Sequence, residues 1–290
     1  MLPELSNFRV LAKDRNGKSA LYRSSAIDRA GARDADIILD DLNIRSVVDL
    51  RTETENNFSS NQQLNDNFEL SSISIVQKSP TLEFKVKAVA NDKRSRQVYC
   101  VSLFQRNVTI VYLKMLPFFR MLSMISLAVI DNLFNTKYFN KRLMSMVGQF
   151  GMRKLYRTMA LNSRAEICAA LKLINTGSQW PLVVMCSVGK DRTGMISALV
   201  QYIQGCSIEQ IQEDYCVSEV NLRRDIHIFQ KAIKGYKLDI EELIQSPKEL
   251  ILVFFDAIRE QSGSVEQWLN DGGFTFSEQQ ELRDKLESVS

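Results

Sequence analysis

One short segment of the chain combines the residue types that nucleophilic phosphate chemistry needs, because five residues separate Cys186 from Arg192. A loop that curls between a strand and a helix can turn successive backbone N–H groups inward, and the helix adds the positive end of its dipole. Such a loop forms a cradle for a phosphate dianion. Arg192 offers a planar fork to two phosphate oxygens. The same positive field favours the thiolate of Cys186, a strong nucleophile that can form a covalent phosphocysteine.

The residues around this pair suit the same chemistry. Gly189 permits a backbone turn that other residues resist, and Thr193 can donate its hydroxyl hydrogen to the sulfur when the sulfur leaves. Lys190 would add positive charge where further phosphates bind. We expect catalysis without a metal ion or an organic cofactor. Substrate binding is expected from Ser187, Val188, Gly189, Lys190, Thr193 and Gly194.

The spacing of a cysteine and an arginine is by itself a weak signal, since Cys100 and Arg106 share it. That second pair encloses no glycine and is followed by Asn-Val instead of Thr-Gly. A nucleotide-binding loop would place Ser or Thr where this chain has Asp191, and a serine hydrolase would need a G-x-S-x-G segment, which the chain lacks. A sulfurtransferase also uses a loop cysteine, but the Thr-Gly pair after the arginine favours phosphate.

Alternating strands and helices are predicted around this loop. A compact apolar run over residues 181–185 leads into it as a buried strand, and a helix is predicted over residues 193–202 directly after it. Further strands are expected over residues 21–24, 44–50 and 70–76, and further helices over residues 32–42, 163–175, 247–260, 265–270 and 277–287. This order predicts an α/β fold in which a central sheet is flanked by helices.

Three short motifs predict where helices or helical turns begin. Each has a hydroxyl residue followed three positions later by Glu or Gln, which is the pattern of a capping box. The pairs are Thr52 with Glu55, Ser163 with Glu166, and Ser207 with Gln210.

Residues 85–150 differ in character from the rest of the chain. They contain few turn signals and many Leu, Met and Phe residues, which predicts two to four helices broken near Pro117 and near Gly148 and Gly151. We expect a single domain over residues 1–290, with this segment as a helical insertion. Its expected use is a lid, because a thiolate is easily oxidised and benefits from cover.

Part of this insertion is apolar enough to raise the question of a membrane. A spanning helix is disfavoured because Lys114, Pro117 and Arg120 interrupt the apolar stretch over residues 108–134. Peripheral membrane contact through residues 85–134 is the alternative use of the segment. Its basic contacts would be Lys85, Lys87, Lys93, Arg94, Arg96 and Arg106, which otherwise form a solvated surface.

The bulk composition is that of an ordinary globular protein, with 45% hydrophobic and 24% charged residues. The net charge is only +3, which does not favour a nucleic-acid partner. Five cysteines without a C-x-x-C pair indicate a reducing compartment, and the single histidine disfavours a structural zinc site. The N-terminus lacks the basic segment and apolar run of a secretory signal, so we expect a cytoplasmic location.

The segment from Cys186 to Gly194 resembles the signature loop of the protein-tyrosine-phosphatase superfamily. Its Gly-Lys-Asp-Arg-Thr-Gly version is similar to the loop of the bacterial-type tyrosine/lipid phosphatases. Residues 21–25, 44–51, 215–218 and 263–269 resemble further segments of that family in the matching order. The resemblance covers most of the chain apart from residues 85–150, and it implies a cysteine-phosphatase fold.

This resemblance also implies an activity and roles for single residues. It implies hydrolysis of phosphotyrosine, and also of phosphoserine, phosphothreonine or phosphoinositide monoesters, through a phosphocysteine. It implies Asp191 as general acid, with Asp49 as the second candidate. In the resembling family a loop lysine such as Lys190 accompanies activity on phosphoinositides. Arg51, a secondary site candidate, and Arg23 are expected to organise the site from buried positions more than to bind substrate.

One residue departs from the family pattern. The family usually has His immediately before the nucleophile, where this chain has Met185. That His orders the loop and promotes the thiolate, whereas Met cannot donate a hydrogen bond. We therefore expect reduced turnover. The alternative is a pseudophosphatase, a module that binds phosphotyrosine or phosphoinositide without hydrolysing it.

Overall fold

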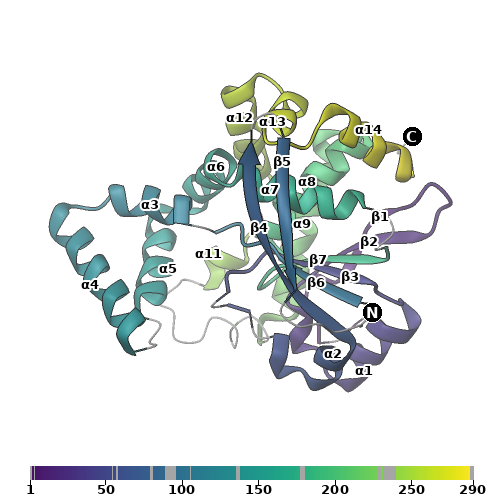
Figure 1. The fold of residues 1–290 in the computed structure, drawn as a ribbon, viewed down its shortest axis with the longest axis horizontal. Helices are drawn as coiled ribbons and strands as arrows, with labels where there is room; N and C mark the ends of the chain where they lie inside the picture. Colours follow the sequence, from purple (N-terminus) through teal and green to yellow (C-terminus); the bar gives the residue numbers. More distant parts are fainter. Residues whose placement is uncertain are drawn as a thin grey trace.

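The computed structural model describes residues 2, 4–53, 55–56, 58–78, 81–88, 96–104, 106–134, 138–176, 180–227, 230 and 240–287. Within these residues the centre is one seven-stranded sheet in the order β1-β2-β7-β3-β6-β4-β5 (Figure 1). Its strands are β1 (Arg9–Lys13), β2 (Ser19–Ser24), β3 (Ser46–Asp49), β4 (Phe68–Lys78), β5 (Thr81–Ala88), β6 (Arg96–Cys100) and β7 (Leu182–Met185).

The five inner strands of this sheet run parallel, and only β1 and β5 pair antiparallel at the two edges. The strand before the predicted loop, β7, lies between β2 and β3, with Met185 in register with Ser24 on one side and Asp49 on the other. Because the carboxyl ends of parallel strands meet at one edge, the segments that follow these three strands lie together. The α/β prediction and the predicted strands near residues 21–24, 44–50, 70–76 and 181–185 are confirmed.

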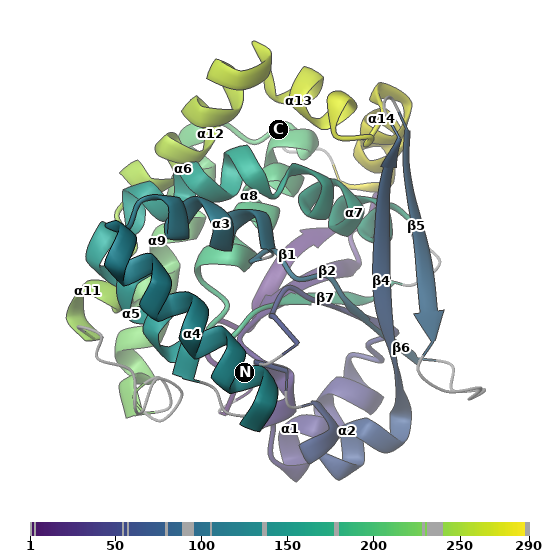
Figure 2. The same ribbon diagram turned by 60° about the vertical axis from the view of Figure 1, so that its left-hand side comes forward.

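Helices cover both faces of the sheet (Figures 1 and 2). One face carries α1 (Ala32–Asp36), which continues into a π-helical turn (Ile37–Asp41), and α2 (Gln62–Asn67). The other face carries α6 (Met152–Asn162), α7 (Arg164–Asn175), α8 (Asp191–Gln204), α9 (Ile208–Arg224), α12 (Glu249–Ser262), α13 (Val265–Asp271) and α14 (Phe276–Lys285). A short helix, α11 (Ile240–Ile244), packs against α9.

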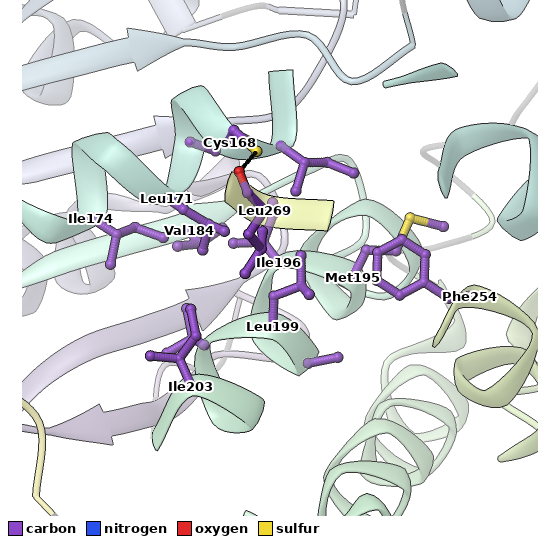
Figure 3. Packing of buried hydrophobic residues seen from close by; sticks show 14 of the residues in the cluster. Cys168, Leu171, Ile174, Val184, Met195, Ile196, Leu199, Ile203, Phe254 and Leu269 are labelled. Carbon is purple, nitrogen blue, oxygen red and sulfur yellow. Dashed lines mark hydrogen bonds between the residues drawn. The ribbon is translucent and has the colours of Figure 1, made fainter. Parts of the chain in front are cut away.

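Strand β7 is apolar and buried at every position because helices cover both faces of the sheet. In β7, Leu182 and Val184 join the larger core on the side of α7 and α8, while Val183 and Met185 join the smaller core on the side of α1 and α2. Figure 3 shows Val184 in the larger core among side chains of α7, α8, α12 and α13. The strand that carries the predicted loop is therefore fixed from both sides.

The insertion between β6 and α6 consists of α3 (Arg106–Lys114), α4 (Phe118–Phe134) and α5 (Tyr138–Phe150), which extend away from the sheet in Figure 1. These helices share a small core of their own, and the predicted breaks near Pro117 and Gly151 are confirmed. The helices begin at Arg106 and not near residue 85, because residues 81–88 and 96–100 form two strands of the sheet. None of the described helices is long and apolar enough to cross a membrane.

The three predicted capping boxes have different outcomes. The Ser207–Gln210 box is complete and starts α9. Helix α7 does begin after Ser163, but the Ser163 hydroxyl donates to the Leu103 carbonyl, so the predicted box there is wrong. Thr52 and Glu55 form a turn in which the Glu55 carboxylate accepts from the Thr52 N–H, but no helix follows directly.

Candidate active site

The loop predicted to do chemistry connects β7 to α8. Strand β7 ends at Met185 and α8 begins at Asp191, so residues 186–190 form the connection. The Cys186 side chain is buried at the end of the strand. The fourteen-residue helix α8 contributes free N–H groups and the positive end of its dipole to the loop.

Three side chains from outside the loop bind its carbonyl groups. Arg29 donates to the carbonyl of residue 187 over 2.9 Å, Asn7 to that of residue 188 over 2.8 Å, and Arg23 to that of residue 189 over 3.0 Å. By contrast, the backbone N–H groups of residues 187–190 have no hydrogen-bonding partner among the described residues. A run of N–H groups left free beside a helix N-terminus is a concave site for an anion.

Gly189 is required by the close approach of another strand end. Its φ is +69°, in the left-handed region, and a Cβ there would lie 2.5 Å from the carbonyl carbon and oxygen of Ser24. Any larger residue would push the loop away from the segment that follows β2. The positive φ and the close contact with Ser24 explain why the turn at residue 189 needs a glycine, as expected from the sequence.

Thr193 lies in the first turn of α8 and is fully buried. Its hydroxyl oxygen has no hydrogen-bonding partner among the described residues. Buried hydroxyls are normally paired. An unpaired one beside Arg192 is therefore available to a group held in the loop.

The guanidinium of Arg192 is held end-on by a carboxylate from the turn after β3. Its two terminal nitrogens each donate over 2.8 Å to Glu55, Nη1 to Oε2 and Nη2 to Oε1. The same carboxylate accepts from the Ser187 hydroxyl at 2.8 Å and from the hydroxyl of Thr52 at 2.8 Å. Nη1 also donates to the Leu50 carbonyl over 3.4 Å and Nη2 to the Ser187 hydroxyl over 3.3 Å, so among the described residues the Nε–H group is the donor of Arg192 that is left for an anion.

The ion pair between Glu55 and Arg192 determines the protonation state of both groups. Burial by itself would raise the pKa of Glu55, but the Arg192 charge and its hydrogen bonds lower it far below the ordinary value of 4.5. Burial would likewise lower the pKa of Arg192, and the Glu55 charge instead raises it. Both groups are therefore charged at neutral pH.

Replacing Glu55 with Gln tests this pairing through the pH dependence of stability. A carboxyl whose pKa is lowered by folding stabilises the fold above its ordinary pKa and loses that contribution as pH falls toward the lowered value. We expect the wild-type chain to be more stable than E55Q at neutral pH, by about 1–3 kcal/mol. The gap should shrink as pH falls below 4.5. Urea unfolding of both chains across this range measures it, and a gap that does not change with pH would contradict the pairing.

Asp191 is the first residue of α8 and is bound by a pair of buried tyrosines. The Tyr156 hydroxyl of α6 donates to Asp191 Oδ1 over 2.8 Å and lies 2.7 Å from the hydroxyl of Tyr215 of α9. Burial first, and the Asp191 charge second, raise the pKa of Tyr156 well above its ordinary value, so this tyrosine remains a neutral donor. The carboxyl is thus fixed at the rim of the loop, with its side chain 22% exposed.

Lys190 is placed differently from the sequence expectation. Its ammonium donates to the carbonyls of Leu243 and Gln245 over 2.5 and 2.8 Å, and the side chain is 1% exposed. The Val188 side chain packs against a small apolar cluster that includes Leu222 of α9 and Ile244 of α11. These contacts therefore do not support the role expected of Lys190, which was to present a positive charge to further phosphates. Its ammonium anchors the end of α11 instead.

Asp49 and Arg51 form a buried ion network beneath the loop. The carboxylate of Asp49 is fully buried and accepts from Arg51 Nε and Nη2 and from the Asn56 amide. Arg51 also donates to both oxygens of Asp28. Burial would lower the pKa of Arg51, but the charges of Asp49 and Asp28 raise it. These contacts fit the organising role expected of Arg51, and they hold Asp49 in a buried ion pair.

Arg23 organises the loop from β2, as expected from the sequence. Besides the loop carbonyl it binds Asp214 of α9, with Nη1 2.5 Å from Oδ2, and Arg9 binds the other oxygen of the same carboxylate over 2.9 Å. Burial would raise the pKa of Asp214, but the Arg23 and Arg9 charges lower it. The loop is therefore tied to α9 through a charged bridge.

Met185 occupies the position before the nucleophile without donating to the loop. Its side chain is fully buried in the smaller core, and its sulfur accepts from the Ile27 N–H over 3.4 Å. Side-chain donors to the loop carbonyls are instead Arg29, Asn7 and Arg23. The loop is ordered by these residues, which lie far away in the sequence.

Several residues of the site were not found by sequence reasoning. Glu55 was singled out only as a helix cap, and the Thr-x-x-Glu pattern carries no sign of a distant arginine partner. The other residues have no local motif at all, because each acts on the loop through a contact more than 30 positions away. They are Asn7, Arg29, Tyr156 and Asp214.

One family model matches nearly the whole chain. A model described as "Tyrosine phosphatase family" matches residues 1–288. A curated relative, "Putative tyrosine-protein phosphatase OCA1" of Yarrowia lipolytica, is 34% identical over 53 residues, which are 18% of this chain and 21% of that protein. The chain therefore matches about a fifth of that relative's length.

Among solved structures, the core catalytic domain of the PP-IP phosphatase SIW14 from S. cerevisiae, in complex with citrate, aligns with a TM-score of 0.38. The alignment has 11% identity and covers 89% of this chain and 91% of that one.

Proposed function

Because this chain belongs to the tyrosine phosphatase family, we propose that it is a cysteine-dependent phosphatase that hydrolyses phosphate monoesters through a phosphocysteine. The observation that carries the proposal is the set of free N–H groups at residues 187–190, arranged between the Cys186 thiol and the Arg192 guanidinium. These groups supply a nucleophile, a cradle for the dianion and a cationic donor beside it, the Nε–H group of Arg192.

In the first half of the proposed reaction, the Cys186 thiolate attacks phosphorus and forms an S–P bond. The bond from phosphorus to the ester oxygen breaks, and Asp191 gives its proton to that oxygen. In the second half the Asp191 carboxylate takes a proton from water, whose oxygen attacks phosphorus. The S–P bond then breaks, inorganic phosphate leaves, and the Thr193 hydroxyl stabilises the returning thiolate.

Phosphotyrosine is the first substrate class that we propose, followed by phosphoserine, phosphothreonine and phosphoinositide monoesters. Ser187, Val188 and Gly189 would contribute through the loop backbone. Gly194 lies in the first turn of α8 with its N–H bound to the Lys190 carbonyl, so it would contribute through the space that it leaves for Tyr215. Because Lys190 is bound to two carbonyls, the cation beside the loop that is open to a larger substrate is the exposed Arg29. We place the activity in the cytoplasm, where the five free cysteines stay reduced.

The test of this proposal is phosphate release by the purified chain on a phosphotyrosine peptide and on phosphoinositides, measured side by side. Release that depends on Cys186 supports the phosphatase, and the ratio of the two rates ranks the substrate classes. Binding of either substrate without release would overturn the activity and favour a pseudophosphatase, with Met185 as the first residue to exchange for His.

Asp191→Asn tests the proposed proton donor. We expect kcat to fall by about 10²–10⁴ on a phosphotyrosine peptide, whose leaving oxygen needs a proton. On an aryl phosphate with a strongly acidic phenol the loss should be much smaller, because that oxygen leaves without protonation. Asp256→Asn, at an exposed position of α12, is the matched control. An equal loss on both substrates would argue that Asp191 only shapes the loop.

A further inference from the structure

Helix α4 has an apolar outer face that the rest of the described chain leaves uncovered. Its inner face, including Met124, contributes to the small core of the insertion. On the outer face, apolar residues recur every three or four positions with side chains between 45% and 69% exposed, namely Phe118, Leu122, Ile125, Val129 and Leu133. Phe119 and Phe134, at the two ends, are 81% and 71% exposed. A helix that is apolar on all sides is normally buried on all sides.

The charge around this face is almost entirely positive. Residues 106–150 contain six Lys or Arg residues and one acidic residue. That acid, Asp131, is used within the insertion, where its carboxylate accepts from the N–H groups of Tyr138 and Phe139. Arg120 and Arg142 form no ion pair with any described residue. An exposed apolar surface with a cationic surround is complementary to an anionic lipid membrane.

A groove between α4 and α5 combines the same two properties. Its volume is about 260 Å³, and its lining includes Arg120 and Arg142 together with the apolar side chains of Leu116, Met124, Met146 and Phe150. The arginines suit a lipid phosphate, and the apolar side chains suit the start of an acyl chain. Within the part of the chain that the structure describes, helix α4 packs mainly against α5 and α3 and projects from the molecule, so a flat surface can reach it (Figures 1 and 2).

We propose that the outer face of α4, with the Arg120–Arg142 groove, docks the protein on the surface of an anionic phospholipid membrane. The helix would lie in the headgroup region and not span the bilayer, which agrees with its length and apolarity. The surface differs from the basic residues first expected to touch lipid, because the Arg96 guanidinium is bound to the carbonyls of Leu39 and Ile44. Of the others in that set, Lys93 and Arg94 lie outside the described residues, and the side chains of Lys85, Lys87 and Arg106 are not described.

The test is sedimentation of the full chain with vesicles, so its readout is independent of phosphatase activity. We expect binding to vesicles of phosphatidylcholine mixed with phosphatidylserine, little binding to phosphatidylcholine alone, and weaker binding in high salt. The double variant I125S/L133S should weaken binding at least about tenfold. Phe276→Ser, whose side chain is 52% exposed on α14, should leave binding unchanged.

A second pair of variants tests the charges without touching the packing of α4. R120Q and R142Q should each weaken binding about fivefold, while Arg33→Gln, at an exposed position on α1, should have no effect. Absence of wild-type binding to phosphatidylserine vesicles would overturn the proposal, as would binding that none of the α4 and groove variants changes. A wild-type dimer in light scattering that I125S/L133S converts to monomer, without vesicle binding, would assign the face to a second copy of the chain and also overturn it.

Discussion

Cys186→Ser is expected to lower phosphate release by at least about four orders of magnitude while leaving substrate binding largely intact. A serine hydroxyl in the same place is a far weaker nucleophile than a thiolate, since nothing among the described contacts of the loop removes its proton. The free N–H groups at residues 187–190 and the Arg192 guanidinium do not depend on the sulfur. Single-turnover phosphate release and calorimetric titration with a phosphotyrosine peptide measure the two effects separately.

Cys206→Ser is the matched control, because Cys206 follows the far end of α8 and, among the described residues, shares no hydrogen bond with the loop. It should retain the wild-type rate. Substantial release by the Cys186→Ser chain would rule out the phosphocysteine, and loss of binding in that chain would mean that the sulfur shapes the cradle.

Arg51→Met is expected to destabilise the fold by about 3–5 kcal/mol, because it leaves a buried carboxylate without its counter-charge. Asp49 is fully buried, and the Asp28 side chain is 3% exposed, so neither can recover solvent in the folded state. Chemical denaturation measures the loss. Adding Asp49→Asn to the variant should restore part of the stability, since it removes one of the two stranded charges.

The same exchange at Arg157 provides a contrast, because Arg157 pairs with Glu260 on the surface with both side chains about half exposed. Solvent screens such a pair, and Arg157→Met should leave the unfolding midpoint nearly unchanged. Unchanged stability in Arg51→Met, combined with loss of activity, would contradict the organising role of Arg51 and place it on the substrate.

Much of the fold was readable from local patterns. The apolar runs before Cys186 and around Val47 were long enough to predict inner strands, and the C-terminal helices followed from their spacing. Strands β5 and β6 were not predicted. Residues 81–88 do carry a strand signal, because Leu82, Phe84, Val86 and Ala88 alternate with polar residues, but the segment from residue 85 was assigned to a helical insertion. Strand β6 is five residues long and has a weaker pattern. The strand form of β6 depends on its pairing with β3 and β4, whose paired residues lie more than 25 positions away in the sequence, whereas β5 pairs with β4, which directly precedes it.

The contrast between Glu55 and Lys190 shows the same limit within the site. Both were noticed in the sequence, the first as a helix cap and the second as a substrate contact. Their partners are Arg192, 137 positions away, and the carbonyls of Leu243 and Gln245, 53 and 55 positions away. The residue type determined which kinds of group each charged side chain can bind. It did not determine which partner in the folded chain each side chain would meet.

The sequence by itself determined the chemical inventory of this protein, which is a Cys, a glycine turn and an Arg placed on a strand–loop–helix unit. Such a unit is local, so spacing and residue type suffice to identify it. Only the tertiary structure decided how the loop is held, because its carbonyls are bound by Asn7, Arg23 and Arg29 from the other end of the chain. It also decided the surroundings of the two candidate carboxylates, since Asp191 keeps a partly exposed side chain while folding encloses Asp49 with Arg51.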